Sequence, residues 1–166
     1  MSAAVPVLPE RLQTERLRLI LISPDDAAAM QQGRHDDVRW HPEYPRPDDV
    51  AAASMVRTGA NTFGPRHIVA GTQAVGSIGF HAPPELAGEE LEVGFGLVPA
   101  ARGRGFAREA LLALVGAVEE RGLRVRASVA PDNRPSLRVL AACGFTDLRG
   151  SDEDGHLVMA RVVTRP

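Results

Sequence analysis

Apolar and polar positions along the chain are most informative between residues 92 and 122, where they predict a strand, a turn and a helix. Residues 92–98 are apolar apart from Glu92 and include Val and Phe, which favour a strand. Pro99 ends that strand, because proline has no N–H to donate. Helical spacing then continues up to Gly122, with one apolar face made of Ala107, Ala110, Leu111, Leu114, Val115 and Val118.

The segment before residue 92 contains patterns for three further strands and two short helices. Strands are expected over residues 14–22, 66–70 and 74–81, and the last two form a hairpin around residues 71–73. One helix is expected from a cap at Ser23 or Asp25 to about Gln32, and another from Asp48 to about Thr58, with Gly59 as its stop. Residues 1–13 are expected to form a flexible arm ahead of a single domain over residues 14–163.

The segment after Gly122 predicts a strand over residues 124–129, a helix over about 132–144, and final strands over 145–149 and 157–163. A strand, a crossover helix and a second strand form a parallel pair. Ligands of such pairs bind in the crevice at the carboxyl ends of the strands. We therefore expect an α/β fold with a mixed sheet and a binding site at that edge.

The turn between the strand and the helix carries Arg102-Gly103-Arg104-Gly105. Two glycines at a helix entrance let the backbone turn tightly and expose the first N–H groups of the helix together. These N–H groups and the helix dipole favour an anion such as phosphate, and the arginines add charged donors. The turn is therefore the candidate phosphate site.

Three phosphate-binding fingerprints can be compared with this turn. A P-loop requires Lys after its second glycine, whereas all nineteen basic residues of the chain are Arg. A dinucleotide fingerprint requires Gly or Ala where Arg108 stands, and an acidic residue that the strand over 124–129 lacks. The acyl-coenzyme A loop, G-x-G followed by a small residue at a helix start, fits Gly103, Gly105 and Ala107.

A wider set of residues agrees with the acyl-coenzyme A loop. It comprises Glu92-x-Gly94-Phe95, Pro99, Gly103-Arg104-Gly105-Phe106-Ala107, Val129-x-Pro131-x-Asn133-x-x-Ser136 and Gly144-Phe145. Together with Thr14-Glu15-Arg16-Leu17, this set resembles the GNAT superfamily of acetyl-CoA-dependent N-acetyltransferases. It is most similar to the Rim-type branch, which includes acetyltransferases of ribosomal-protein N termini. The resemblance spans residues 14–162 and implies a mostly antiparallel sheet with a splayed parallel strand pair and helices on both faces.

The resemblance implies acetyl-CoA as cosubstrate and a set of residues that hold it. The pyrophosphate would lie against the backbone N–H groups of Arg102, Gly103, Arg104, Gly105, Phe106 and Ala107. The pantetheine would lie beside the splayed strand at Leu97 and Val98, and a strand N–H near Leu97 would stabilise the oxyanion. Asn133, Ser136 and Arg138 would complete the cofactor site, or else serve as helix caps and a solvated helix charge.

The resemblance also implies direct attack of an amine on the acetyl thioester. Glu92 is the candidate base that takes the amine proton, or it is a solvated strand residue without a role. Alternative bases lie in the loop before residue 47, at Asp36, Asp37 and Glu43. Ser136 is the candidate proton donor to the leaving thiolate, because Leu140 stands where many family members have Tyr.

The acceptor side is less defined by sequence. The loop over residues 36–47 holds the single Trp and the single Tyr of the chain, Trp40 and Tyr44. It is either a packed surface loop or a wall of the acceptor site. Trp40, Tyr44 and Phe80 are the candidate acceptor contacts, and the acceptor would be a protein N terminus or a small-molecule amine.

Composition and charge narrow the class of partner. A net charge of −2 over 166 residues gives no reason to expect nucleic acid or an anionic membrane as a partner. The five histidines are scattered, so no metal site is expected, and Cys143 is expected in the core. Neither a secretory leader nor a long apolar run is seen, so a reducing cytoplasm is expected. The resemblance also implies that a homodimer is possible. The alternative to an enzyme is a catalytically silent acyl-CoA-binding module.

Overall fold

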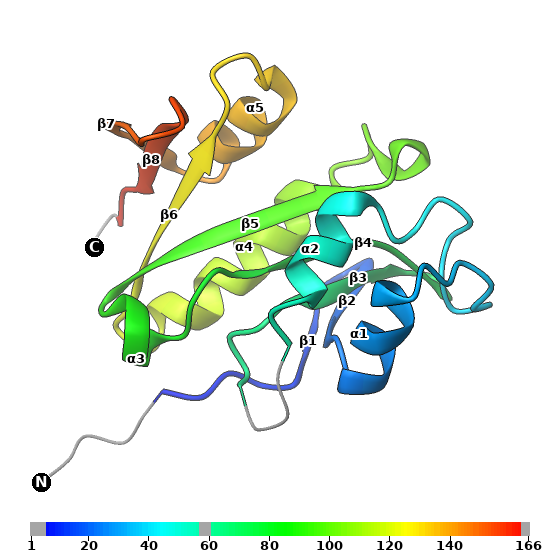
Figure 1. The fold of residues 1–166 in the computed structure, drawn as a ribbon. Coiled ribbons are helices and arrows are strands. Elements are labelled where there is room, and N and C mark those ends of the chain that lie inside the picture. Colours follow the sequence, from blue (N-terminus) through cyan, green and yellow to red (C-terminus); the bar gives the residue numbers. More distant parts are fainter. Residues whose placement is uncertain (1–5, 57–60, 164–166) are drawn as a thin grey trace, which may run out of the picture.

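The computed structural model describes residues 6–56 and 61–163, which form an eight-stranded mixed sheet with helices on both faces (Figure 1). The strand order is β1-β2-β3-β4-β5-β6-β8-β7. The strands are β1 (Arg11–Gln13), β2 (Leu17–Leu21), β3 (Arg66–Ala70), β4 (Gln73–Phe80), β5 (Glu90–Leu97), β6 (Arg124–Val129), β7 (Phe145–Ser151) and β8 (Leu157–Arg161). Neighbouring strands are antiparallel except for β5 and β6. The predicted mixed and mostly antiparallel sheet is confirmed.

The parallel pair of β5 and β6 is short. It joins residues 90–92 of β5 to residues 124–126 of β6, and beyond Glu92 the two strands separate (Figure 1). The Glu92 carbonyl accepts from the His81 N–H at 2.9 Å and the Val98 N–H donates to the Val75 carbonyl at 2.8 Å, so these residues direct their backbone groups toward β4. Because backbone direction alternates along a strand, Phe95 and Leu97 direct theirs to the side of β6, beyond the last pair of the ladder, where β5 is open.

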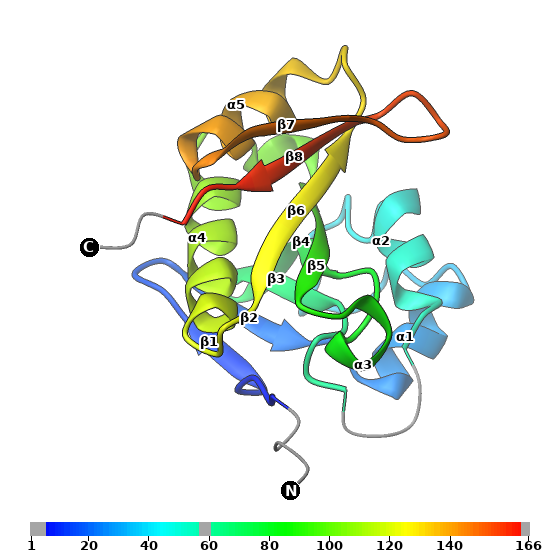
Figure 2. The same ribbon diagram turned by 90° about the vertical axis from the view of Figure 1, so that its left-hand side faces the viewer.

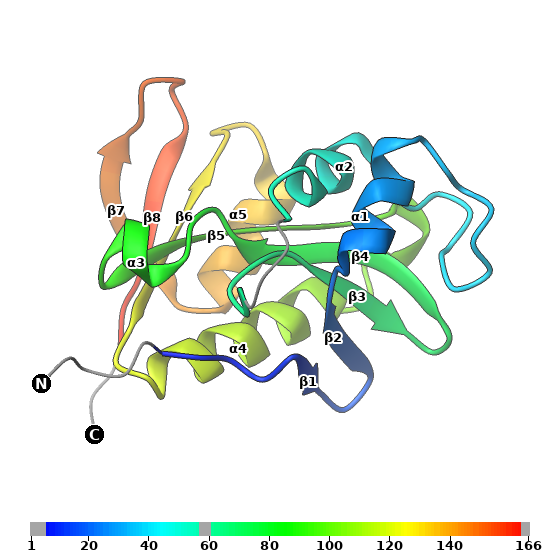
Figure 3. The ribbon, with the colours of Figure 1, turned by 60° about the horizontal axis from the view of Figure 1, so that its bottom comes forward.

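Helices cover the two faces of the sheet. Figures 2 and 3 show α1 (Pro24–Gln31) and α2 (Pro47–Ala53) on one face, and α4 (Phe106–Glu119) and α5 (Arg134–Ala142) on the other. A short helix, α3 (Pro84–Ala87), lies in the connection before β5. Within the described residues, every helix is too short or too polar to cross a bilayer.

Helix α4 supplies the largest helical part of the core. It buries Ala110, Leu111, Leu114, Val115, Ala117 and Val118. The predicted apolar face is therefore confirmed, with Ala117 as an addition and Ala107 only half-buried. Burial of one Leu side chain is worth about 1.5–3 kcal/mol, so this face fixes α4 against the sheet.

The N-terminal segment differs from the sequence prediction. Residues 11–13 pair with β2 as strand β1, and Leu8 is 1% exposed, with its N–H bonded to the Thr62 hydroxyl at 2.8 Å. The flexible arm expected over residues 1–13 is therefore wrong from Leu8 onward, because this segment completes the sheet edge and covers core side chains. Residues 1–5 lie outside the described residues.

Two helix predictions need adjustment. Helix α1 begins at the predicted Ser23 cap, whose hydroxyl accepts from the Asp26 N–H at 3.0 Å. Helix α2 is shorter than predicted, because it ends at Ala53 with Ser54 as C-cap. The expected end at Thr58 and stop at Gly59 lie outside the described residues.

The loop over residues 36–47 is packed into the core. Tyr44 is fully buried and Trp40 is 3% exposed, with the two ring centroids 5.8 Å apart at an interplanar angle of 84°. The Tyr44 hydroxyl bonds to Nδ1 of His67 at 2.7 Å, and Nε2 of His67 bonds to the Asp26 carboxylate at 2.9 Å. Burial raises the pKa of Tyr44 well above its usual value. Trp40 and Tyr44 are therefore core residues and not the wall of a cleft; both bury a large apolar surface, and the Tyr44 hydroxyl has a hydrogen-bond partner.

The buried network predicts an acid-sensitive contribution to stability. The hydrogen bond from His67 lowers the pKa of Asp26 below its ordinary value of 3.8. A carboxylate with a lowered folded pKa stabilises the fold above its unfolded pKa and loses that contribution as pH falls through the folded pKa. Asp26→Asn is therefore expected to lower the free energy of unfolding by about 1–3 kcal/mol at pH 7, with a smaller difference at pH 3.

Urea unfolding of the wild type and the variant at both pH values measures this difference. Asp25→Asn is the matched control, because Asp25 lies exposed in the same helical turn. If Asp26→Asn lowers the free energy of unfolding equally at pH 7 and pH 3, the stabilising role of the Asp26 carboxylate is contradicted.

Candidate active site

The glycine turn presents a row of backbone N–H groups. A 3-10 turn over Pro99–Ala101 follows β5, and Gly103 and Gly105 both have φ of +79°, a conformation that favours glycine. The N–H groups of residues 103–108 have no backbone partner in the described part of the chain. Space is open around Gly103, where an added Cβ would meet no atom within 4 Å. This arrangement of N–H groups at a helix start is able to cradle phosphate oxygens.

Arg102 does not present its N–H to that cradle. Its N–H donates to the Pro99 carbonyl at 3.2 Å, and its Nε donates to the Leu97 carbonyl at 3.1 Å. Arg102 therefore braces the turn against the end of β5. The predicted row of donors begins at Gly103 instead and extends to Arg108.

Arg16 fixes the glycine turn from the N-terminal part of the chain. Its Nε and its backbone N–H donate to the Glu109 carboxylate at 2.8 and 2.9 Å, and its Nη1 donates to the Arg104 carbonyl at 2.8 Å. Its guanidinium carbon lies 4.7 Å from the centroid of the Phe106 ring. The Thr14 hydroxyl also donates to Glu109. Although Thr14-Glu15-Arg16-Leu17 contributes to the family resemblance, the sequence alone did not show this role.

The Glu109 carboxylate is held away from the N–H groups of its own helix. Desolvation would raise the pKa of Glu109, but hydrogen bonds from Thr14 and Arg16 outweigh it and keep the pKa below its usual value. A negative charge in the first helical turn stabilises the helix dipole but repels a bound anion. Arg16 balances that charge next to the candidate phosphate site.

The start of α5 lies at the end of β6, so it belongs to the same edge of the parallel pair as the glycine turn. Asn133 caps the helix, because its Oδ1 accepts from the Ser136 N–H at 3.3 Å. Ser136 is half-buried and Arg138 is exposed. Leu140 is 1% exposed, so the position where the family resemblance expects Tyr faces the core.

Leu97 and Val98 differ in what they offer a ligand. Both backbone groups of Val98 are used, because its N–H bonds to the Val75 carbonyl at 2.8 Å and its carbonyl accepts from the Ala101 N–H at 3.0 Å. Val98 therefore has no free N–H to offer the predicted pantetheine contact. The Leu97 carbonyl accepts from Nε of Arg102, so the Leu97 N–H on the open side of β5 is the group that keeps its place in the candidate site.

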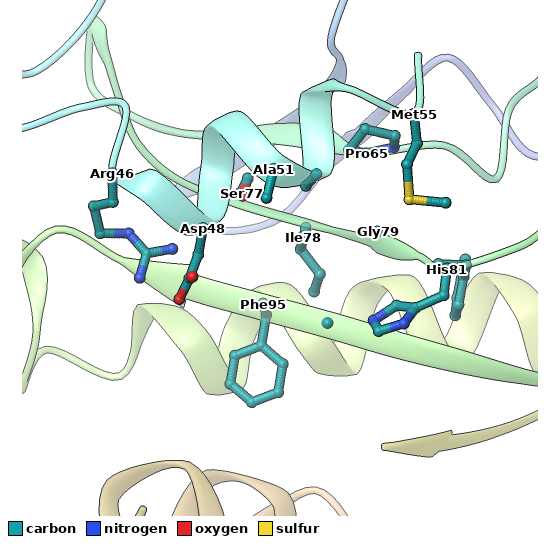
Figure 4. Close-up of a pocket in the computed structure, with 13 residues that line it drawn as sticks. Arg46, Asp48, Ala51, Met55, Pro65, Ser77, Ile78, Gly79, His81 and Phe95 are labelled. Carbon is teal, nitrogen blue, oxygen red and sulfur yellow. The ribbon is translucent and has the colours of Figure 1, made fainter. Parts of the chain in front are cut away.

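A cavity of about 390 Å³ lies between α2 and strands β4 and β5 (Figure 4). It is on the sheet face that α1 and α2 cover. Residues that line it include Arg46, Met55, Ile78, Phe80, His81 and Phe95. The predicted contact Phe80 lines this cavity, whereas Trp40 and Tyr44 do not. A cavity of this size, with apolar walls and a few polar groups, is typical of a small-molecule site.

Glu92 meets the cavity through His81. The Glu92 carboxylate lies 2.9 Å from Nδ1 of His81 and accepts from the Ser128 hydroxyl at 3.0 Å, while Nε of Arg126 lies 3.6 Å away. The His81 side chain is 58% exposed, whereas that of Glu92 is 23% exposed. An added Cβ at Gly94 would lie 3.0 Å from Nε2 of His81, so the imidazole lies directly over β5. A single histidine after a strand gave no signal in the sequence.

The structure brings together most of the predicted cofactor residues and one alternative base, because Glu43 accepts from the Ala100 N–H at 3.3 Å, beside the glycine turn. The glycine turn, Leu97 and the start of α5 share the edge where β5 and β6 separate. Asp37 is instead paired with Arg39 at 2.6 Å. Cys143 is buried, as predicted, and burial raises the pKa of its thiol, so it is not an activated nucleophile.

Solved structures similar to the chain are acetyltransferases. An acetyltransferase from Agrobacterium tumefaciens str. C58 is 28% identical with a TM-score of 0.67, and the match covers 98% of each chain. Ribosomal-protein-S5-alanine acetyltransferase from Vibrio fischeri is 19% identical with a TM-score of 0.66, covering 92% of this chain and 96% of that one. The microcin C7 self-immunity acetyltransferase MccE, in complex with acetyl-CoA and AMP, is 18% identical with a TM-score of 0.65, covering 90% and 94%. The last two show likeness of fold alone.

No curated protein matches the chain at a significant level. The family model of the acetyltransferase (GNAT) domain matches residues 16–146, which is most of the chain. That match begins at Arg16 and includes the glycine turn, the cavity and the start of α5. The chain therefore belongs to the GNAT acetyltransferases, which are acyltransferases that depend on acetyl-CoA.

Proposed function

We propose that the protein transfers an acetyl group from acetyl-CoA to a primary amine by direct attack of the amine. The observation that carries this proposal is the unpartnered row of N–H groups over residues 103–108, placed where β5 leaves β6. Such a row fits a pyrophosphate, and the open backbone at Leu97 fits an amide chain that extends from it. Bound acetyl-CoA supplies an activated thioester, and the residues described below act on the acceptor and the leaving group.

The cosubstrate residues follow from this geometry. Gly103, Arg104, Gly105, Phe106 and Ala107 hold the pyrophosphate through their backbone N–H groups. Leu97 aligns the pantetheine on the open side of β5. Asn133, Ser136 and Arg138 approach from the start of α5, where the side-chain amide, the hydroxyl and the guanidinium are available for hydrogen bonds.

The acceptor amine approaches from the cavity on the α2 face. An ammonium has no lone pair, so it must lose a proton before it can attack. His81 lines the cavity and is the general base in this proposal, with Nε2 as the atom that takes the proton. Glu92 orients the imidazole through Nδ1 and stabilises the imidazolium that forms. The sequence-based assignment of Glu92 as the base is thus replaced by a positioning role.

Two further groups complete the reaction. The Leu97 N–H faces the open side of β5 and donates to the developing oxyanion, and one such donor lowers a barrier by roughly 3 kcal/mol. When the C–S bond breaks, the Ser136 hydroxyl donates a proton to the thiolate and takes up in return the proton that the attacking nitrogen loses as the amide forms. The buried Leu140 offers no hydroxyl at its position.

Gly103→Glu is expected to weaken acetyl-CoA binding at least ~100-fold, because it adds bulk and negative charge at the pyrophosphate. Calorimetry with acetyl-CoA and thiol release with a panel of amines measure this change against a wild type that binds at micromolar concentration. Gly155→Glu is the matched control, since Gly155 has the same φ of +79° and open space around it, in the β7–β8 turn. Binding that survives Gly103→Glu would displace the phosphate site, and wild-type binding without thiol release for any amine would indicate a silent binding module.

Arg16→Ala is expected to weaken acetyl-CoA binding about 10-fold, because Glu109 is then left unbalanced beside the phosphates. Removing the Glu109 charge in Arg16→Ala/Glu109→Gln is expected to restore part of that loss. Arg18→Ala is the control, because Arg18 contacts the Gly71 carbonyl at 3.0 Å, away from the turn. If the double variant binds no better than Arg16→Ala, the role of Arg16 is purely structural.

His81→Ala is expected to lower kcat by about 10²–10⁴-fold and to change the pH dependence of kcat, with acetyl-CoA affinity unchanged. Glu92→Gln is expected to give a smaller loss, because the imidazole remains. His156→Ala in the β7–β8 turn is the control. An unaffected kcat in His81→Ala together with a large loss in Glu92→Gln would return the role of base to Glu92.

A further inference from the structure

We propose that the acceptor is a small amine with a carboxylate near its nitrogen, such as a free amino acid with an apolar side chain, and that Arg46 binds the carboxylate. This inference rests on the proposed acetyl transfer and adds the chemical class of the acceptor. It arises from the positions of Arg46 and His81 at the two ends of the cavity (Figure 4).

Arg46 is held rigidly at one end of the cavity. Its Nε and Nη2 donate to the Asp49 carboxylate at 3.0 and 2.8 Å, and its backbone N–H donates to the same group at 2.8 Å. Asp49 is fully buried and also accepts from the Ser77 hydroxyl. A guanidinium fixed in this way loses little conformational entropy when it binds a ligand.

Part of the Arg46 fork remains available. Nη1 makes no hydrogen bond within the described residues, although the Arg46 side chain is only 18% exposed. Asp49 already receives four donors, so it does not require Nη1. The outer edge of the guanidinium thus has unused donors toward the cavity, which match a carboxylate.

The glycines of β5 set the distance between Arg46 and His81. A Cβ at Gly96 would overlap the Arg46 guanidinium, with Nη1 only 2.6 Å away, and a Cβ at Gly94 would lie 3.0 Å from Nε2 of His81. Gly94 and Gly96 lie two residues apart on one face of the strand, a separation of roughly 7 Å. One ligand is therefore able to reach the base with its amine and the guanidinium with its carboxylate.

The remaining walls favour an apolar body. Ala51, Ala52, Met55 and Pro65 give the α2 side of the cavity apolar groups. Ile78, Phe80 and Phe95 line it through the sheet backbone, because their side chains alternate with Ser77, Gly94 and Gly96 and point to the other face. A cavity of about 390 Å³ accommodates an apolar amino acid, whose side chain would lie on these walls. A peptide N terminus carries a neutral amide where a free amino acid carries the carboxylate, so it would not use the charge of Arg46.

Asp48 limits the strength of this recognition. It also lines the cavity, but it is exposed to solvent, so its repulsion of a carboxylate is screened. Because Asp49 offsets the charge of Arg46 as well, recognition depends on directed hydrogen bonds more than on net charge. We therefore expect a preference for the carboxylate of about 10-fold.

The test compares matched acceptors with the wild-type protein. Phenylalanine, leucine and methionine are each assayed as the free acid, the carboxamide and the decarboxylated amine, with rates expressed per unprotonated amine. The expected result is a kcat/KM about 10-fold higher for the acids, mainly through KM. Equal or better use of the amides and amines would overturn the carboxylate assignment while leaving acetyl transfer intact. Acetylation of polyamines or peptides alone would do the same, and no acetylation of any amine would remove the proposed function itself.

Variants then test the role of Arg46. Arg46→Met/Asp49→Asn removes the charge pair together, so that Asp49 is not left buried and unpaired. Gly96→Ala tests the same contact independently by displacing the guanidinium. Both are expected to reduce the acid-to-amide ratio toward one, with acetyl-CoA affinity retained. Arg39→Gln, a change at an exposed arginine away from the cavity, is the control. A folded variant that keeps the wild-type ratio would overturn the role of Arg46.

Discussion

The separation of β5 from β6 after only three residue pairs is the constraint on which the rest of the structure depends. A continued ladder would have used the backbone groups of Phe95 and Leu97 within the sheet. Instead the Phe95 backbone and the Leu97 N–H face an open side, and the two helices that follow the parallel strands both begin at this edge. The divergence therefore creates both a place for an extended chain and two helix starts beside it.

A phosphate cradle at a helix start must be both rigid and free of negative charge. Glu109 lies in the first turn of α4, where it stabilises the helix but opposes an anion. The turn between β1 and β2 resolves this conflict, because Arg16 pairs with Glu109 and bonds the Arg104 carbonyl. The turn between β1 and β2 thus supports the proposed phosphate site, although it is far from that site in sequence.

Glycines in β5 make room for side chains on the sheet face that α2 covers, opposite the face that α4 covers. Gly94 and Gly96 leave room for His81 and Arg46 to lie against the strand, which a side chain at either position would prevent. His81, the proposed base, follows β4, and Arg46, the proposed anchor of the carboxylate, lies at the start of α2. The pleat of a third element, β5, sets their spacing, and this spacing would limit the length of ligand that reaches both.

The sequence by itself determined the helix over residues 106–119, the parallel strand pair and the glycine turn, because each is written in local periodicity and in residues with special backbone geometry. It did not determine which segments pack over the sheet and which side chains they bury. Trp40 and Tyr44 have the composition of a binding wall but are core, and Leu8 belongs to the core instead of a loose arm. His81 and Arg16 became functional candidates only through partners distant in sequence, Glu92 and Glu109. Such pairings depend on strand order and on helix packing, which no local pattern encodes, so the tertiary structure alone decided them.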